Sequence, residues 1–532
     1  SPDLTREHSG QPASLPPLPP QDIAKRRGAI YAVAPSFLNV RTLWAGTDDG
    51  LVWITRDQGK SWKDVTPPLL TPWSKVTQIS ASPFDDDTAY ASVSRFRLDD
   101  LHPYLYRTRD GGATWQSISK GLADNAPVNT VRADLVRKGL LFAGTETAIW
   151  MSLDEGDHWQ SLQLNLPHTS MRDFCNQGND LVLATHGRSI WVLDDISPLR
   201  QLDATSSSAG AFLFKPGEAI RVRRSTNTDT PIPSDEPAGQ NPPDGAALDY
   251  YLARSASGPV TLEILDAENH LVRRYASDDA PAATPETLNR QLIPLYWIRM
   301  PRTLSAAAGM HRWIWDLRHA APAAANGEYP ISAIPHDTPS LPEGPLALPG
   351  LYTVRLTVDG HTSSARLAVR MDPRVSASSG DLTALFTLES HLASLVSSSA
   401  EASLQAQGLQ EQVQGLSKKA PAPLAASLAS LDKDLSVLRK GAGDPMKPGL
   451  DALAGSLGAI YAQVGQADAH PTEVQESTAT RLSGALKESL ANWDQIRTAT
   501  LPGLNRQLRE AHLDELNLKH EPQARPGGRD ED

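Results

Sequence analysis

An eight-residue segment that ends in tryptophan occurs three times in the first third of the chain, and it constrains the fold more than any other feature. The copies are residues 55–62, 108–115 and 152–159, spaced about 50 residues apart. Each has a hydroxyl residue, an aspartate two residues later and a glycine two residues after that, a pattern typical of a hydrogen-bonded turn. Repetition at this period favours an array of small sheets.

We expect each aspartate to bond the amides of its own turn, each glycine to supply a positive φ, and each tryptophan to pack between sheets. The residues predicted to have these structural roles are Asp57, Gly59, Trp62, Asp110, Gly112, Trp115, Asp154, Gly156 and Trp159. In the third copy, His158 stands where a hydroxyl is expected. The three aspartates are therefore interpreted as turn formers and not as catalytic acids.

Short apolar runs separated by turn residues predict four-stranded antiparallel units between residues 28 and 200. Four-stranded units at this period indicate blades of a β-propeller, and the segment contains about 3.5–4 of them. So few blades do not close a ring. We therefore expect the missing blades to come from an upstream segment of the same gene product or from another chain.

The turns resemble the Asp-box, or bacterial neuraminidase repeat. Residues 184–195 resemble the last blade of large bacterial proteins with sortilin-like propellers, which are often labelled glycosyl hydrolases. The similarity continues through residues 240–245, 309–316 and 349–354, and it covers roughly residues 1–375. The resemblance implies a periplasmic or secreted protein and a propeller that binds peptides or proteins, but it does not define a reaction.

The remainder of the chain divides by composition into a multidomain, mainly β protein with a helical end. Residues 1–27 are a proline-rich connector, and residues 211–375 contain alternating strands that resemble the immunoglobulin-like sandwich of flagellar hook-cap proteins. Residues 380–515 have leucines at helical spacing, broken by prolines and glycines into about four helices, which predicts an antiparallel bundle. Residues 516–532 form a polar tail.

Charge and cysteine content exclude several functional classes. A net charge of −12 over 532 residues argues against nucleic-acid binding, which needs a basic face. The single cysteine, Cys175, excludes an internal disulfide framework and is expected to be a buried core thiol. No apolar run is long enough to span a membrane. We predict neither a cofactor nor a metal site.

The candidate functional residues lie on the turns between the second and third strands of each unit and on the connections between units, which emerge together at one face of a propeller. The candidate catalytic carboxylates are Asp48, Asp49, Asp99, Asp100 and Glu146. The candidate ligand-binding residues are Trp73, Arg95, Arg97, His102, His186 and Arg188. Turn chemistry also explains most of these residues, but it explains the loop 95–102 least well.

Two functions remain open at this point. The first is an extracytoplasmic binding or assembly module that recognises protein, peptide or glycan. The alternative is a glycoside hydrolase, because a pair of carboxylates beside an aromatic platform such as Trp73 suits the cleavage of a glycosidic bond. A sialidase reaction is disfavoured because the rim has no evident tyrosine–glutamate pair. Whether the protein is an enzyme is left undecided by the sequence.

Overall fold

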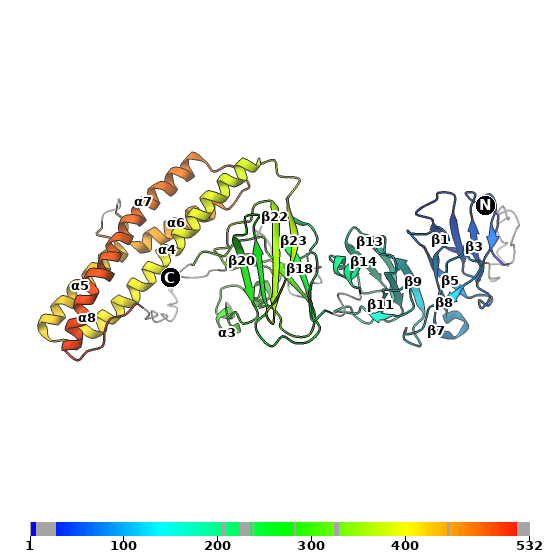
Figure 1. The fold of residues 1–532 in the computed structure, drawn as a ribbon, viewed down its shortest axis with the longest axis horizontal. Helices are drawn as coiled ribbons and strands as arrows, with labels where there is room; N and C mark the ends of the chain where they lie inside the picture. The colour runs from blue at the N-terminus through cyan, green and yellow to red at the C-terminus, as the bar shows by residue number, and fades with distance from the viewer. Residues whose placement is uncertain are drawn as a thin grey trace. The chain divides into compact units, whose positions relative to one another are not determined.

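The computed structural model describes residues 2–6, 28–203, 209–223, 233, 235–236, 239, 241–280, 283–323, 329–443 and 447–518. The chain forms two compact units, Ser1–Ser208 and Ala209–Asp532 (Figure 1). Most of the predicted connector (residues 7–27) and most of the predicted tail (519–532) lie outside the described residues, as do residues 204–208.

The first unit consists of consecutive antiparallel sheets whose strands pair in chain order. The first sheet contains β1 (Ile30–Pro35), β2 (Leu43–Thr47), β3 (Val52–Thr55) and β4 (Lys63–Asp64). The second contains β5 (Lys75–Ala81), β6 (Ala89–Arg95), β7 (Asp100–Thr108) and β8 (Gln116–Ser117). The third contains β9 (Val128–Ala133), β10 (Leu141–Thr145), β11 (Ile149–Ser152) and β12 (Gln160–Ser161). The fourth contains β13 (Met171–Gln177), β14 (Asp180–Thr185) and β15 (Ile190–Leu193), and α1 (Ser197–Gln201) follows it.

Successive sheets pack face to face, and each first strand packs against the first strand of the next sheet. Separate apolar cores fill the spaces between the first and second, the second and third, and the third and fourth sheets. This is how blades follow one another in a β-propeller. The predicted series of four-stranded antiparallel sheets is therefore confirmed.

The three tryptophan-terminated turns have the same hydrogen bonds. In the first, Asp57 accepts bonds from the Ser61 amide (2.9 Å), the Ser61 hydroxyl (2.6 Å) and the Thr55 hydroxyl (2.8 Å). The Ser61 hydroxyl is the main reason that the pKa of Asp57 falls to about 2. In the third turn the His158 ring nitrogen replaces the hydroxyl, with Nδ1 2.7 Å from Asp154. The carboxylates are thus held within their own turns.

Each of the later turn tryptophans is also bonded to the preceding sheet. Trp115 Nε1 donates to the Val65 carbonyl at 2.6 Å, and Trp159 Nε1 donates to the Ile118 carbonyl at 2.7 Å. The turn glycine allows this approach, because a Cβ on Gly112 would lie 2.6 Å from the Val65 side chain. One indole thus joins two sheets at each boundary.

The fourth sheet corrects one expectation. Cys175 on β13 is exposed, whereas the neighbouring Phe174 is buried in the core between the third and fourth sheets. Successive side chains of a strand point to opposite faces, so burying Phe174 turns Cys175 outward. The predicted buried thiol is wrong.

The second unit begins with two sheets that share one core. The smaller sheet has the order β16 (Ala211–Leu213), β18 (Ala246–Leu252), β21 (Gly309–Trp315). The larger has the order β17 (Ala219–Arg221), β23 (His361–Met371), β22 (Gly350–Val358), β19 (Thr261–Leu265), β20 (Leu271–Ala276), in which β17 and β23 are parallel. Two short helices, α3 (Pro285–Leu288) and the 3-10 helix Leu295–Trp297, lie between β20 and β21 in the chain.

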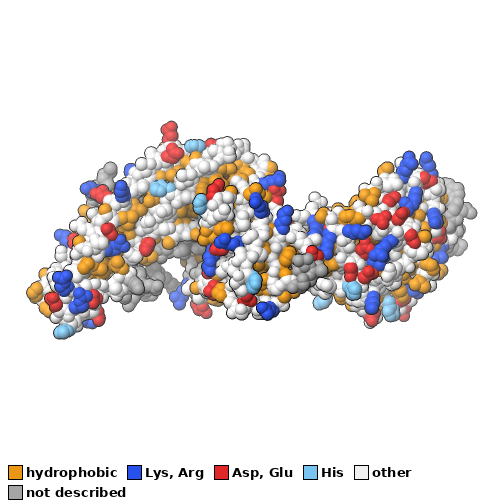
Figure 2. All heavy atoms as spheres, in the orientation of Figure 1, with side chains coloured by type: hydrophobic (Ala, Val, Ile, Leu, Met, Phe, Trp, Pro, Cys, Tyr) orange, Lys and Arg blue, Asp and Glu red, His pale blue; other side chains and the backbone are white. Residues whose placement is uncertain are grey.

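The helical region contains α4 (Ser379–Ser417), α5 (Ala422–Lys440), α6 (Leu450–Val464), α7 (Glu473–Gln495), a π-helical turn (Ile496–Thr500) and α8 (Leu501–Glu510). A leucine-rich core joins these helices, which lie side by side in Figure 1. Figure 2 shows hydrophobic side chains along the grooves between them. The predicted helical C-terminal region is confirmed. The last helix ends at Glu510, but the apolar core reaches further than expected, because Leu516, assigned to the polar tail, is buried in it. Within the described residues, no helix is long and apolar enough to cross a membrane.

A buried ion pair connects the sandwich to the bundle. Arg221 on β17 lies 2.9 Å from Asp468 in the α6–α7 connection, and both side chains are almost fully buried. Arg223 also binds Asp468, at 3.0 Å. Burial lowers the pKa of Arg221, and the charge of Asp468 opposes that shift. Charges this deeply buried depend on each other for stability.

We predict that Trp159→Phe lowers the free energy of unfolding by about 1–3 kcal/mol, because the Ile118 carbonyl loses its donor. Urea unfolding of the first unit measures the change. Leu164→Ala, a truncation at an exposed position, is the control and should change stability by less than about 0.5 kcal/mol. Equal effects of the two substitutions would contradict the assigned role of Trp159.

We predict that Asp468→Asn destabilises the second unit by about 3–5 kcal/mol, since it leaves Arg221 buried without a counter-charge. Asp494→Asn is a matched control, because Asp494 pairs with Arg497 at the surface and should contribute at most about 1 kcal/mol. Denaturant unfolding followed by circular dichroism of the helices compares the two. If Asp468→Asn lowers the free energy of unfolding by no more than Asp494→Asn does, the result would be inconsistent with a buried ion pair.

Candidate functional site

The predicted rim residues lie at the hairpins between second and third strands, except Trp73, which lies in the connection between the first and second sheets. In the second sheet this connection contains a 3-10 helix: Phe96–Leu98 follows β6 and is capped by Asp99, which adopts a left-handed conformation with φ 58°. The chain then enters β7 at Asp100, which pairs with Arg95 across the hairpin. This loop brings several charged side chains together.

Asp100 is the centre of that cluster. Its carboxylate accepts hydrogen bonds from the Tyr104 hydroxyl (2.8 Å) and the His102 amide (3.1 Å), and it lies 2.9 Å from His102 Nδ1. Arg95 Nε lies 3.3 Å from the same carboxylate, and its guanidinium stacks over the Tyr104 ring at 5.3 Å from the centroid. We call Arg95, Asp100, His102 and Tyr104 the loop cluster.

The electrostatics of the loop cluster favour an ionised Asp100. Partial burial by itself raises the pKa of this carboxyl, but the hydrogen bonds from Tyr104 and His102 and the charge of Arg95 outweigh it, so the pKa lies below its usual value. Burial and the bond to Asp100 both raise the pKa of Tyr104. Asp100 is therefore suited to orienting the loop or to acting as an ionised partner, and it is not suited to donating a proton.

The structure corrects the assignment of Asp49. This side chain is 1% exposed, and it accepts bonds from the Thr47 hydroxyl and from the Arg6 amide at 2.7 Å. It holds the turn after β2 and fixes residues 2–6 against the first sheet. A carboxylate buried in this way does not reach a substrate, so Asp49 is removed from the catalytic candidates.

The other candidate carboxylates remain accessible to different degrees. Asp48 is partly exposed and accepts a bond from the Ala29 amide at 2.7 Å. Glu146 is partly exposed and lies 3.4 Å from Arg172, a residue of β13 in the next sheet. Asp99 is exposed at the tip of the loop. These three are the acids that a large ligand could reach.

The remaining predicted binding residues are dispersed. Trp73 is half-buried with φ 67°, and its amide donates to the Asp49 carbonyl at 2.9 Å. Arg97 is exposed, with its guanidinium 5.7 Å from the Phe96 ring centroid. His186 and Arg188 are exposed on the β14–β15 turn. Side-chain contacts join Arg95, Asp100 and His102 of the predicted set.

Sequence reasoning missed Tyr104, which is not among the predicted rim residues. Its hydroxyl reaches back four residues to Asp100, because β7 begins with a tight approach to the hairpin. A tyrosine on a strand that faces an acidic loop is the signal that could have indicated it. The tyrosine has an acidic partner after all, although that partner is an aspartate.

Carboxyl groups with a raised pKa lie in the second unit, where burial raises the pKa of Asp316 and of Glu389. Asp316 lines a cavity of about 550 Å³ together with Arg273, Arg299, His319 and Glu343. Burial lowers the pKa of His319, so its ring is neutral near pH 7. No candidate was predicted in this cavity from the sequence.

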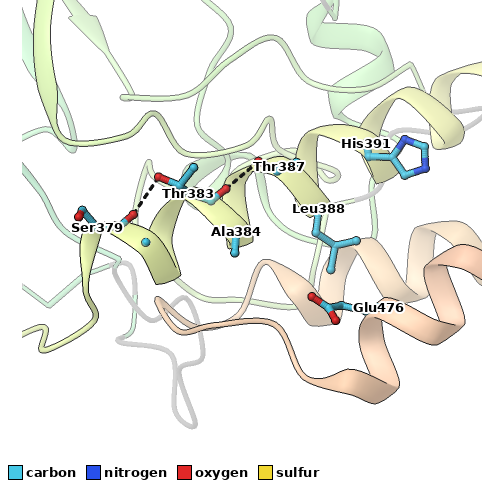
Figure 3. Close-up of a pocket in the computed structure, with 8 residues that line it drawn as sticks. Ser379, Thr383, Ala384, Thr387, Leu388, His391 and Glu476 are labelled. Atoms are coloured by element: carbon cyan, nitrogen blue, oxygen red, sulfur yellow. Dashed lines mark hydrogen bonds between the residues drawn. The ribbon is translucent and has the colours of Figure 1, made fainter.

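A second hollow, of about 730 Å³, lies between the first turns of α4 and the start of α7. Figure 3 shows the residues that line it. The Thr383 and Thr387 hydroxyls that line it donate to carbonyls of their own helix, at 2.8 Å each. His391 and Glu476 are the titratable side chains of this surface. Its polar groups are thus largely used within the helix.

A group of possible metal ligands occurs on one hairpin. Oxygen or nitrogen atoms of Asp266, Glu268 and His270 lie within 4.8 Å of one another. Asp266 already accepts bonds from the Glu268 and His270 amides, at 3.0 and 2.8 Å. These bonds are those of a β-hairpin turn, and they account for the grouping.

Comparison with known proteins gives a partial similarity. No family model matches the chain. A curated protein described as a probable oligoxyloglucan-reducing end-specific xyloglucanase, from Neosartorya fischeri, is 27% identical over 217 residues. The match covers 36% of this chain and 26% of that protein, so the chain spans about a quarter of the length of the relative. The chain is thus similar to a glycoside hydrolase over part of its length.

Solved structures give weaker matches. A GH74 enzyme from Niastella koreensis is 15% identical with a TM-score of 0.25, over 53% of this chain and 29% of that one. The GH74 xyloglucanase from Xanthomonas campestris is 14% identical with a TM-score of 0.25, over 63% of this chain and 45% of that one. YCF48 bound to a D1 peptide is 19% identical with a TM-score of 0.26, over 31% of this chain and 51% of that one. The sheets described above, rather than these scores, define the fold.

We predict that Asp100→Asn destabilises the first unit at neutral pH and has progressively less effect at acid pH. The folded-state pKa of Asp100 is below its unfolded value, so its contribution is complete above about pH 3.9 and is lost as the pH falls through the folded-state pKa. Urea unfolding at a series of pH values measures this. A difference between variant and wild type that is constant down to pH 2 would show that the carboxylate is not stabilised by its neighbours.

Proposed function

We propose that the chain is part of a β-propeller glycoside hydrolase that acts on a polysaccharide of the xyloglucan class. The observation that carries the proposal is the 27% identity over 217 residues to the xyloglucanase. The substrate is taken to approach the rim of the first unit, where Asp48, Asp99 and Glu146 are accessible. This function is the alternative that the sequence left open.

Hydrolysis of a glycosidic bond needs two carboxyl groups with different protonation states. In the proposed site, Asp100 supplies the ionised group or orients the loop that carries Asp99. The proton donor is Asp99 or Glu146, which are both accessible to a ligand at the rim. Trp73 and the exposed arginines of the rim would contact the sugar rings and hydroxyls.

A second candidate function, a non-catalytic binding or assembly module, is favoured by a different observation. The carboxylates of Asp49 and Asp100 are saturated by protein donors, as expected of groups that shape a loop. Such a module would recognise protein, peptide or glycan through Arg97, His102, His186 and Arg188. The two proposals differ in whether bound glycan is cleaved.

Several finer assignments accompany these proposals. We propose that the turns belong to the Asp-box repeat of sortilin-like propellers and that the two-sheet region is immunoglobulin-like. A periplasmic or secreted location follows from the same resemblance. We also propose that the propeller is completed by blades from an upstream segment of the same gene product or from another chain.

The test is a panel of xyloglucan and unrelated polysaccharides, assayed for new reducing ends. We predict turnover on xyloglucan that falls at least about 100-fold in Asp99→Asn or Glu146→Gln, because loss of an acid–base group costs about 10²–10⁴ in rate. Glu488→Gln, at an exposed position of α7, is the matched control and should retain full activity.

Asp316→Asn is assayed in the same panel. If this variant alone loses turnover, the catalytic centre lies in the cavity of the second unit and not at the rim. Binding of a glycan without turnover, unchanged by any of these substitutions, would favour the binding module. Absence of both binding and turnover across the panel would contradict a polysaccharide ligand.

A further inference from the structure

The cavity that Asp316 lines lies at the open side of the two-sheet region in the second unit. β20 is the last strand of the larger sheet and β21 is the last strand of the smaller one. Arg273 comes from β20, and Asp316 directly follows β21. The connection between these two strands supplies Leu288, Gln291 and Arg299 to the wall. The volume, about 550 Å³, falls in the range of about 300–1,000 Å³ that is typical of small-molecule sites.

The polar side chains around this cavity are held in place by their neighbours. Arg299 Nε donates to Asp337 at 2.7 Å, and Glu343 lies 2.9 Å from Arg318. The Arg318 amide donates to one carboxylate oxygen of Asp316 at 3.1 Å. The wall of the cavity is therefore preorganised, which lowers the entropy cost of binding a ligand.

Two groups in this wall keep unused hydrogen-bonding capacity. The second carboxylate oxygen of Asp316 has no hydrogen bond within the described residues. The Arg273 guanidinium contacts the Tyr275 ring, 5.2 Å from its centroid, and Nη1 lies 3.5 Å from the His319 carbonyl, but Nε is buried without a partner in the described structure.

The same two groups act on each other without touching. Burial raises the pKa of Asp316, and the charge of Arg273 opposes that rise. No salt bridge joins the two side chains in the part of the chain that the structure describes. Buried polar groups normally have partners, so an acceptor and a donor left open in one cavity indicate a ligand that bridges them.

The balance of charge in the cavity favours a neutral ligand. The described charged side chains that line it are two arginines and two acids, Arg273, Arg299, Asp316 and Glu343. The His319 ring is neutral near pH 7, because burial lowers its pKa. An anion such as phosphate would add an uncompensated negative charge. A molecule with neighbouring hydroxyl groups can donate to a carboxylate and accept from a guanidinium at the same time.

We propose that this cavity binds a neutral saccharide unit through the Asp316 carboxylate and the Arg273 guanidinium. The hydroxyl groups of the sugar would bridge these two side chains. Leu288, Pro301 and Pro339 also line the cavity and would contact the apolar face of the sugar ring. The site is independent of the proposed hydrolase activity at the rim, because it lies in the second unit and shares no residue with the rim.

Ligand-observed nuclear magnetic resonance tests the site on the full chain, with methyl glucoside, methyl xyloside and methyl galactoside as ligands. These are single uncharged rings, and at least one should bind at millimolar concentration. Arg273→Met and Asp316→Asn should each weaken binding at least about tenfold, because each removes one side of the bridge. Arg274→Met and Asp279→Asn are the matched controls. These two residues pair with each other at the surface, at 3.4 Å, and their variants should bind as the wild type does.

A third variant separates loss of the site from loss of folding. Gln291→Trp keeps every charge of the cavity and places an indole inside it. It should abolish binding while the circular dichroism of the chain stays that of the wild type. Inorganic phosphate is the anionic comparison, and it should not displace the bound glycoside.

Three results would overturn the proposal. One is that none of the three glycosides binds. Another is binding of equal strength in Arg273→Met, Asp316→Asn and Gln291→Trp, which would place the ligand elsewhere on the chain. The third is displacement of the glycoside by inorganic phosphate, which would show that the cavity takes anions. The experiment measures no turnover, so the hydrolase proposal succeeds or fails separately.

Discussion

The hydrogen bond from a turn tryptophan to a carbonyl of the preceding sheet is the contact on which the first unit depends. A four-stranded sheet of this size cannot bury both faces alone, so each sheet needs a neighbour. The indole supplies apolar area and a donor at the same place, and the turn glycine removes the side chain that would block the approach. The aspartate fixes the turn that carries both the tryptophan and the glycine. Stability and blade order therefore come from one repeated segment.

This arrangement leaves the opposite edge of the sheets free to vary. The connections between second and third strands lie outside the repeated tryptophan-terminated segment, and one of them contains the loop cluster. There Tyr104 and Arg95 hold Asp100 ionised, and the left-handed turn at Asp99 leaves that side chain exposed. A rigid scaffold with a charged loop at its rim can serve ligand binding or hydrolysis, and the partial similarity to a xyloglucanase favours the second.

The repeated turns and the helical leucine spacing made the sheets and the bundle predictable, because both patterns are local. The contacts that were missed are long-range or depend on exact geometry. Nothing local indicates that Arg221 will meet Asp468, and the contact of Tyr104 with Asp100 depends on how the hairpin folds back on its own strand. Asp49 was proposed as catalytic because its burial depends on residues 2–6, which are distant in sequence. The exposure of Cys175 could not be predicted either, because it depends on which face of β13 is buried.

The most direct test of the account is hydrogen exchange at the indole nitrogens, followed by nuclear magnetic resonance on protein with labelled tryptophan. If the turn tryptophans join the sheets, the Nε1 protons of Trp115 and Trp159 should exchange only through cooperative unfolding of the first unit, and at matching rates. Exchange of these two protons at the rate of a solvent-exposed indole would contradict the central claim.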